Sequence, residues 1–199
     1  MHLTKHPVDT ITSVYTQQAS RGLMLAGSIL TGGSLFLLSL LPQVPADATR
    51  LATWVEHGSG LLMWSDELLF FAVICWWAGA WGVFRAPAAA RSVRVTIGFT
   101  SLAVALISLI IVLLELDFSA DSLALVISSA FGALHLALLG FTVAAVALSW
   151  ATRAGILGRI IGIIVAIILL TGSFPWLTPS WWNSLVALVL ATWGGFVAF

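Results

Sequence analysis

Apolar runs long enough to cross a lipid bilayer follow one another along the chain and limit the folds open to it. A helix needs about 20 apolar residues to cross a hydrocarbon core of ~30 Å. Such runs occupy residues 22–41, 65–84, 95–114, 123–150, 156–174 and 180–199. Hydrophobic residues make up 60% of the chain and charged residues 8%, whereas about a quarter of a soluble domain is charged. The sequence therefore predicts an all-α polytopic membrane protein, a bundle of six transmembrane helices.

The predicted domain organisation is simple. Residues 1–20 are polar and are expected to form a cytoplasmic N-terminal tail, helical in part. Residues 21–199 are expected to form a single six-helix transmembrane domain. Almost all of this domain lies in apolar runs, so any chemistry must occur within the bilayer or at its surfaces.

The basic residues are divided unequally between the two ends of the predicted spans. Short loops rich in Lys and Arg stay in the cytoplasm. Arg50 falls at one end of the spans, and all other basic residues fall at the opposite end: Lys5, Arg21, Arg85, Arg91, Arg94, Arg153 and Arg159. This division predicts a multi-pass membrane protein with both the N- and the C-terminus in the cytoplasm.

Charge also excludes some partners. Eight Lys and Arg residues balance eight Asp and Glu residues, and the basic patches that nucleic acid requires are missing. The expected partner is the lipid bilayer, while a homo-oligomer, a membrane-complex partner and an unidentified small-molecule ligand stay open. The single cysteine, Cys75, lies within an apolar run and is interpreted as a small buried hydrophobe.

Ser65, Asp66 and Glu67 form the strongest polar cluster near a span. In one interpretation Ser65 is the N-cap of the second helix, and the two carboxylates lie in its first turn, where the helix dipole favours negative charge. In the other, the helix begins near Ser59 and embeds the acids about two turns inside it. The acids would then be paired, protonated or in contact with water.

His135 lies near the middle of the fourth span, on a stripe with Ser128, Thr142 and Ser149. A stripe of small and polar residues is typical of a packed helix interface. The alternative is a cavity in which His135 faces Asp66 or Glu67 and forms a proton relay or binds a polar substrate.

His57 completes the candidate polar site, and it lies in the long connection between the first two spans. With Asp66, Glu67 and His135 it would supply metal ligands only if that connection packed into the bundle. We therefore expect no metal site, and no motif identifies a cofactor. The string from His57 to Gly60 lacks the strand that a nucleophile elbow needs, so the catalytic residues stay unknown.

Residues 42–64 are expected to form the longest outer connection. Leu51, Trp54 and Val55 share one face, which predicts a short amphipathic helix on the membrane surface. That helix would either cover a cavity that opens outward or anchor the turn. Tryptophans near the ends of the spans are interpreted as interface anchors: Trp54, Trp64, Trp150, Trp176, Trp181 and Trp182.

Two segments carry a resemblance to known sequences. The string WSDELLFFAVICWWAGAWGVFR, and later SSAFGALHLALLGFTVAAVALSW followed by GSFPW, resemble uncharacterised six-helix integral membrane proteins of actinobacteria and other bacteria. The resemblance implies the six-helix architecture and a plasma-membrane location. It implies no activity, because that group has no established one.

The leading functional prediction is a non-enzymatic membrane protein: a small transporter, a permeation element or a membrane-complex subunit with an outward-facing polar site. The candidate residues of that site are Asp66, Glu67, His135, Ser65 and His57. The alternatives are an intramembrane enzyme or redox protein that acts on a lipid-like substrate, and a purely structural or regulatory membrane partner.

Overall fold

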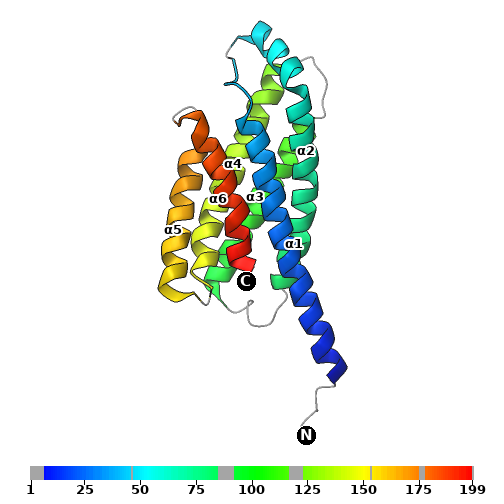
Figure 1. Cartoon of the computed structure of the whole chain (residues 1–199), viewed down its shortest axis with the longest axis vertical. Helices are drawn as coiled ribbons and strands as arrows, with labels where there is room; N and C mark the ends of the chain where they lie inside the picture. The colour runs from blue at the N-terminus through cyan, green and yellow to red at the C-terminus, as the bar shows by residue number, and fades with distance from the viewer. Residues whose placement is uncertain are drawn as a thin grey trace.

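The fold is a bundle of six helices, seen in a computed structural model that describes residues 7–45, 47–84, 92–116, 123–152, 154–174 and 178–198 (Figure 1). The helices are α1 (Pro7–Ser39), α2 (Ala48–Phe84), α3 (Val93–Leu116), α4 (Leu123–Ser149), α5 (Gly155–Gly172) and α6 (Ser180–Ala198). Each is long and apolar enough to cross a membrane. The prediction of an all-α, multi-pass membrane protein is confirmed.

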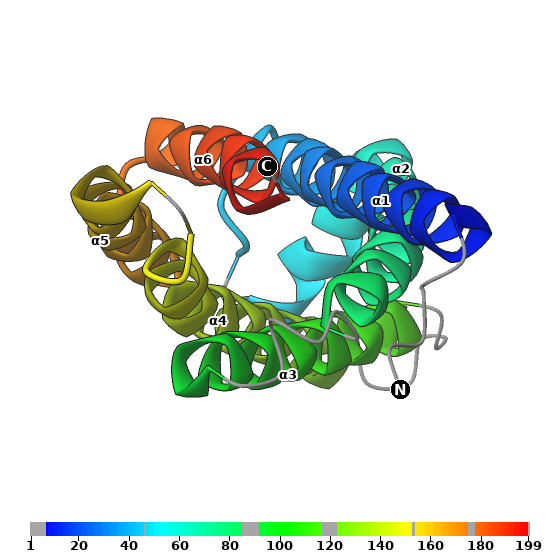
Figure 2. The ribbon, with the colours of Figure 1, turned by 90° about the horizontal axis from the view of Figure 1, so that it is seen from below.

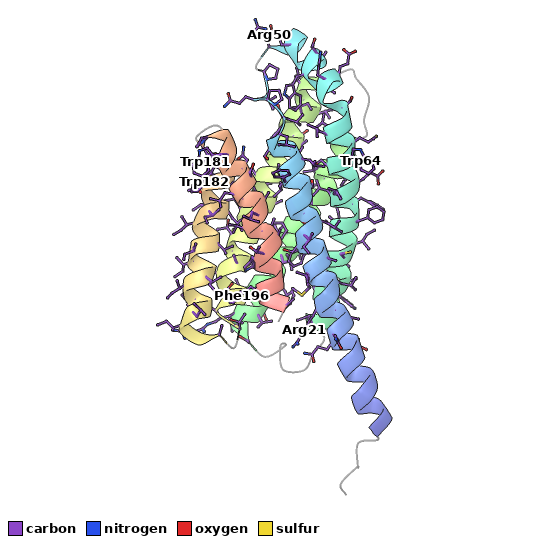
Figure 3. All side chains as sticks on the ribbon, in the orientation of Figure 1. Arg21, Arg50, Trp64, Trp181, Trp182 and Phe196 are labelled. Carbon is purple, nitrogen blue, oxygen red and sulfur yellow. The ribbon has the colours of Figure 1, made fainter. Side chains whose placement is uncertain are left out.

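The helices form a closed ring in which each packs against its neighbours in the chain and α6 returns to α1 (Figure 2). α1 begins and α6 ends at the same end of the bundle, which we call the termini end (Figure 1). Arg21 lies toward this end and Arg50 at the opposite end, which we call the Arg50 end (Figure 3). Arg94 and Arg159, near the starts of α3 and α5, also lie toward the termini end.

Three aromatic side chains fill the centre of the ring. Trp76 of α2, Phe141 of α4 and Trp193 of α6 are fully buried, and their ring centroids lie 5.9 to 6.5 Å apart. The Trp76 indole donates to the Thr31 hydroxyl at 3.2 Å, and the Trp193 indole donates to the Ser149 hydroxyl at 3.1 Å. A buried indole N–H needs such an acceptor, because burial removes the hydrogen bond that it would make to water. The aromatic cluster therefore closes the centre of the bundle, and both of its indole N–H groups are hydrogen-bonded.

Small residues let α1 approach both α2 and α6 closely. A Cβ atom at Gly27 would lie 2.9 Å from the Trp76 backbone nitrogen, and one at Gly32 would lie 2.6 Å from the Ala187 carbonyl oxygen. The Ser28 hydroxyl donates to the Leu190 carbonyl and accepts from the Gly194 N–H at 3.1 Å. This close packing is typical of membrane helices, whose association depends on short contacts rather than on a hydrophobic drive.

The outward faces of the helices carry large apolar side chains. Trp64 and Trp181 are each 61% exposed and lie at similar heights, below Arg50 (Figure 3). Tryptophans gather where hydrocarbon meets headgroups. The two side chains therefore mark the expected membrane boundary at the Arg50 end. Trp176 lies outside the described residues.

α2 is much longer than the second span predicted from the sequence. The prediction placed a connection over residues 42–64 and a new helix from 65, or from about Ser59, but the helix begins at Ala48. Both starting points were wrong, because polar groups in this stretch do not interrupt the helix. The His57 ring donates to the Thr53 carbonyl and the Ser59 hydroxyl donates to the Glu56 carbonyl, bonds that a helix accommodates.

The first turns of α2 lie across the end of the bundle before the helix turns downward (Figure 1). Leu51 and Trp54 are buried there against Ile127 of α4, with Val55 packed beside them. The predicted apolar face of this segment is therefore confirmed, although it belongs to α2 and is not a separate helix. Trp54 contributes to a small core and is not only a surface anchor.

Candidate functional site

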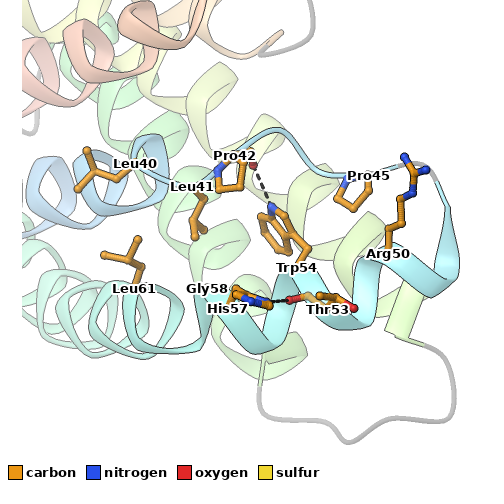
Figure 4. A pocket seen from close by; sticks show the side chains of 10 residues that line it. All are labelled: Leu40, Leu41, Pro42, Pro45, Arg50, Thr53, Trp54, His57, Gly58 and Leu61. Atoms are coloured by element: carbon orange, nitrogen blue, oxygen red, sulfur yellow. Dashed lines mark hydrogen bonds between the residues drawn. The ribbon is translucent and has the colours of Figure 1, made fainter.

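A pocket at the Arg50 end combines apolar walls with a cation (Figure 4). Its volume is about 610 Å³, and it lies between the start of α2 and the segment that follows α1. The residues that line it are Leu40, Leu41, Pro42, Pro45, Arg50, Thr53, Trp54, His57, Gly58 and Leu61. This is a size suited to a small molecule or to part of a lipid.

One face of α2 forms the floor of the pocket. Arg50, Trp54, His57 and Leu61 follow one another at spacings of three and four residues, which places them on the same side of a helix. The polar groups lie toward the start of the helix and Leu61 lies toward the bundle. The pocket is thus amphipathic, with its cation farthest from the membrane centre.

A hydrogen bond holds the opposite wall in place. The Trp54 indole donates to the Pro42 carbonyl at 2.9 Å (Figure 4). This bond ties the extended chain after α1 to α2, and Pro42 and Pro45 restrict the backbone of that chain. The wall is consequently preformed, which reduces the entropy that a ligand would have to offset on binding.

The charges of the pocket are accessible. The Arg50 Nε lies 4.0 Å from the Asp47 Oδ2, and both side chains are mostly exposed. An exposed pair at this distance is worth at most about 1 kcal/mol, so an anionic ligand can compete for the guanidinium. His57 is exposed, and its Nδ1 donates to the Thr53 carbonyl at 2.7 Å.

Ser65 is part of a helix contact and not an N-cap. It lies inside α2, buried, and its hydroxyl shares a 2.6 Å hydrogen bond with the Ser34 hydroxyl of α1. The N-cap interpretation was wrong because α2 begins well before Ser65. The pair satisfies two buried hydroxyls at the α1–α2 interface, as small polar residues do between membrane helices.

The two neighbouring acids face different surroundings. Glu67 is exposed, on the same outward side of α2 as Trp64 and Phe71. Asp66 is half-buried, and its Oδ1 is shielded from solvent. Asp66 lies about 27 Å from the Phe84 end of α2 at 1.5 Å per residue. This is nearly the thickness of a hydrocarbon core, so both acids lie close to the expected membrane boundary.

His135 contacts the end of α5. Its Nδ1 donates to the Ser173 carbonyl at 2.7 Å, and its ring packs edge-on against Phe174 with centroids 4.9 Å apart. The last carbonyls of a helix lack partners within that helix, so the imidazole completes the C-terminus of α5. These contacts favour the packed-interface interpretation of His135.

The five predicted site residues thus lie in three places: His57 in the pocket, Ser65 to Glu67 on α2 nearer the membrane, and His135 at the end of α5. Within the described ranges, no group of three or more His, Cys, Asp and Glu side chains is positioned to hold a metal ion.

Sequence reasoning did not assign Arg50 to a site. The spacing of Arg50, Trp54, His57 and Leu61 was the available signal, since it places a cation, an indole and an imidazole on one helical face. This pattern can be recognised only if the helix is known to begin before Arg50.

Comparison of the chain with models of protein families, with curated proteins and with solved structures finds no match. The resemblance to bacterial six-helix proteins stays a prediction.

Proposed function

We propose that this multi-pass membrane protein is a non-enzymatic binding subunit of the bacterial plasma membrane that holds a small amphiphilic molecule at its Arg50 end. The observation that carries the proposal is the preformed pocket, with Arg50 and His57 away from the membrane and Leu40 and Leu61 toward it. A molecule with a polar group and an apolar part matches both regions at once.

The Arg50 end is proposed to face the outside of the cell. Arg21, Arg94 and Arg159 lie toward the termini end, and Arg50 lies at the other end. The positive-inside rule then favours cytoplasmic termini. In this orientation the pocket opens at the outer surface, where it is reached by ligands from outside or from the outer leaflet.

Binding is favoured over an open permeation path because the bundle centre is closed. Trp76, Phe141 and Trp193 are each at most 1% exposed and contact one another there. A small transporter would have to separate these rings in each cycle. A binding subunit can use the outer pocket without any such movement.

The pocket is tested by filling it. Thr53→Trp adds a large side chain to the pocket wall, and Ala52→Trp adds the same side chain at the neighbouring exposed position outside it. Both proteins are purified in mild detergent, and the molecules that copurify are measured by native mass spectrometry. We expect at least a tenfold loss of bound amphiphile in Thr53→Trp only. Equal occupancy in the two variants would contradict the proposal.

The acids near the boundary provide a second test, for the transport alternative. Replacing Asp66 by Asn and Glu67 by Gln is expected to abolish transport if these carboxylates carry a cation or a proton. Under the binding proposal the double variant retains the copurifying amphiphile, because neither acid lines the pocket.

A further inference from the structure

An apolar groove lies near the pocket, against the last turns of α1. The groove has a volume of about 480 Å³ and lies between α1 and α6. Its walls are Gly32, Gly33, Phe36, Ser184, Leu185, Ala187, Leu188 and Ala191. Phe36 of the groove and Leu40 of the pocket are four residues apart, and both are exposed. The groove therefore lies beside the end of α1, and the pocket begins directly after that end.

The groove suits a hydrocarbon chain. Its walls are glycine, alanine, leucine and phenylalanine, and the one hydroxyl among them, that of Ser184, is 2.9 Å from the Ser39 hydroxyl and shares a hydrogen bond with it. On α6 the walls of the groove run from Ser184 to Ala191, about 10 Å at 1.5 Å per residue. One leaflet of a ~30 Å hydrocarbon core is about 15 Å deep. The groove thus follows most of the depth of one leaflet.

The pocket suits an anionic headgroup. The Arg50 guanidinium offers planar, paired N–H donors that match a phosphate. It lies above the level of Trp64 and Trp181 (Figure 3), where headgroups are expected. Thr53 and His57 lie one and two turns along the same helix and line the same pocket.

We infer that pocket and groove form a single site for an anionic phospholipid of the leaflet at the Arg50 end, with its phosphate at Arg50 and one acyl chain between α1 and α6. This inference rests on the proposed function and names its ligand class. It gives a role to Arg50, which lies at the end of the bundle where the described residues include no other Lys or Arg.

The charge is tested in nanodiscs that contain equal amounts of phosphatidylglycerol and phosphatidylcholine with identical acyl chains. The ratio of the two lipids retained by the protein is measured by native mass spectrometry. We expect a preference for phosphatidylglycerol that falls about fivefold in Arg50→Gln, the effect of one basic residue near anionic lipid. Arg159→Gln, an exposed arginine toward the termini end, is the control and keeps the preference.

The groove is tested by a bulky substitution on its wall. Leu188 is 62% exposed, so Leu188→Trp obstructs the groove without entering the core. Ile167→Trp places the same bulky side chain at an exposed position of α5 and is the control. We expect Leu188→Trp to lower retention of both lipids and to leave their ratio unchanged. Phe36→Ala, which removes a groove wall, gives the same loss if the tryptophan variant does not fold.

The outcomes separate the two proposals. Retention of both lipids in equal amounts, still lost in Thr53→Trp, overturns the phospholipid inference and leaves the pocket function intact. Absence of any retained lipid or other amphiphile in the wild-type protein overturns both. Full displacement of the lipid by soluble glycerol phosphate would assign the pocket to a free phosphate. A dimer that dissociates in Leu188→Trp would assign the groove to a second copy of the chain. Either result would also overturn the inference.

Discussion

The Trp193 indole of α6 donates a hydrogen bond to the Ser149 hydroxyl at the end of α4, with 3.1 Å between the two atoms. Both residues are buried. Ser149 also contacts α5, since a Cβ atom at Gly162 would lie 2.7 Å from the Ser149 Cβ. Three helices thus meet at this one serine, next to the aromatic cluster.

Ser149→Ala is expected to lower the free energy of unfolding by about 0.5 to 2 kcal/mol, because it leaves the indole N–H buried and unpaired. Trp193→Phe removes the donor, and the double variant should cost less than the sum of the single changes. Unfolding in mixed micelles followed by fluorescence gives the three values. Ser128→Ala, where an exposed serine bonds its own helix, is the control; strict additivity would contradict the predicted bond.

Gly194→Ala is expected to separate α1 from α6. Its Cβ atom would overlap the Ser28 side chain and lie 3.1 Å from the Trp76 ring. Overpacking of this kind costs about 1 to 3 kcal/mol. Gly132→Ala is the matched control, since a Cβ atom there meets nothing within 4 Å and helix propensity favours alanine by up to about 1 kcal/mol. Thermal unfolding of the two variants should shift in opposite directions, and a stable Gly194→Ala protein would show that the contact is looser.

The number of spans and the approximate position of each were predictable because length and apolarity suffice to recognise a membrane helix. The start of α2 was not, because Glu56, His57 and Ser59 look like a connection until their local bonds are seen. The apolar residues between them carry little information about where the helix begins or where lipid begins.

The buried cluster was also hidden from sequence reasoning. Side chains that face lipid and side chains that face the centre are both apolar, so no periodic pattern separates Trp76 from Trp77. Their different surroundings are clear only in the structure, where Trp76 is fully buried and Trp77 is 48% exposed. Position along the span shows only that Trp76, Trp77 and Trp193 are not anchors at the ends of their spans, and it does not tell which of them are buried.

The proposed orientation predicts which residues are accessible from outside the cell. Cys75→Ala removes the single native thiol. Thr53→Cys then adds one at the Arg50 end and Ala154→Cys adds one toward the termini end, both at exposed positions. A membrane-impermeant maleimide should label the Thr53→Cys protein in intact cells and the Ala154→Cys protein only after permeabilisation. The reverse pattern would invert the topology and place the pocket in the cytoplasm.

His135→Leu is expected to destabilise the contact between α4 and α5. It removes the donor to the Ser173 carbonyl and leaves that oxygen without this partner, at a cost of about 1 to 3 kcal/mol. His135→Asn retains an N–H donor at the same distance from the backbone as Nδ1 and should recover at least half of the loss. Unfolding in mixed micelles provides the comparison, and copurification of the amphiphile should be unchanged in the asparagine variant, because His135 lies outside the pocket. An asparagine variant that is fully stable but loses its ligand would instead assign His135 to a binding role.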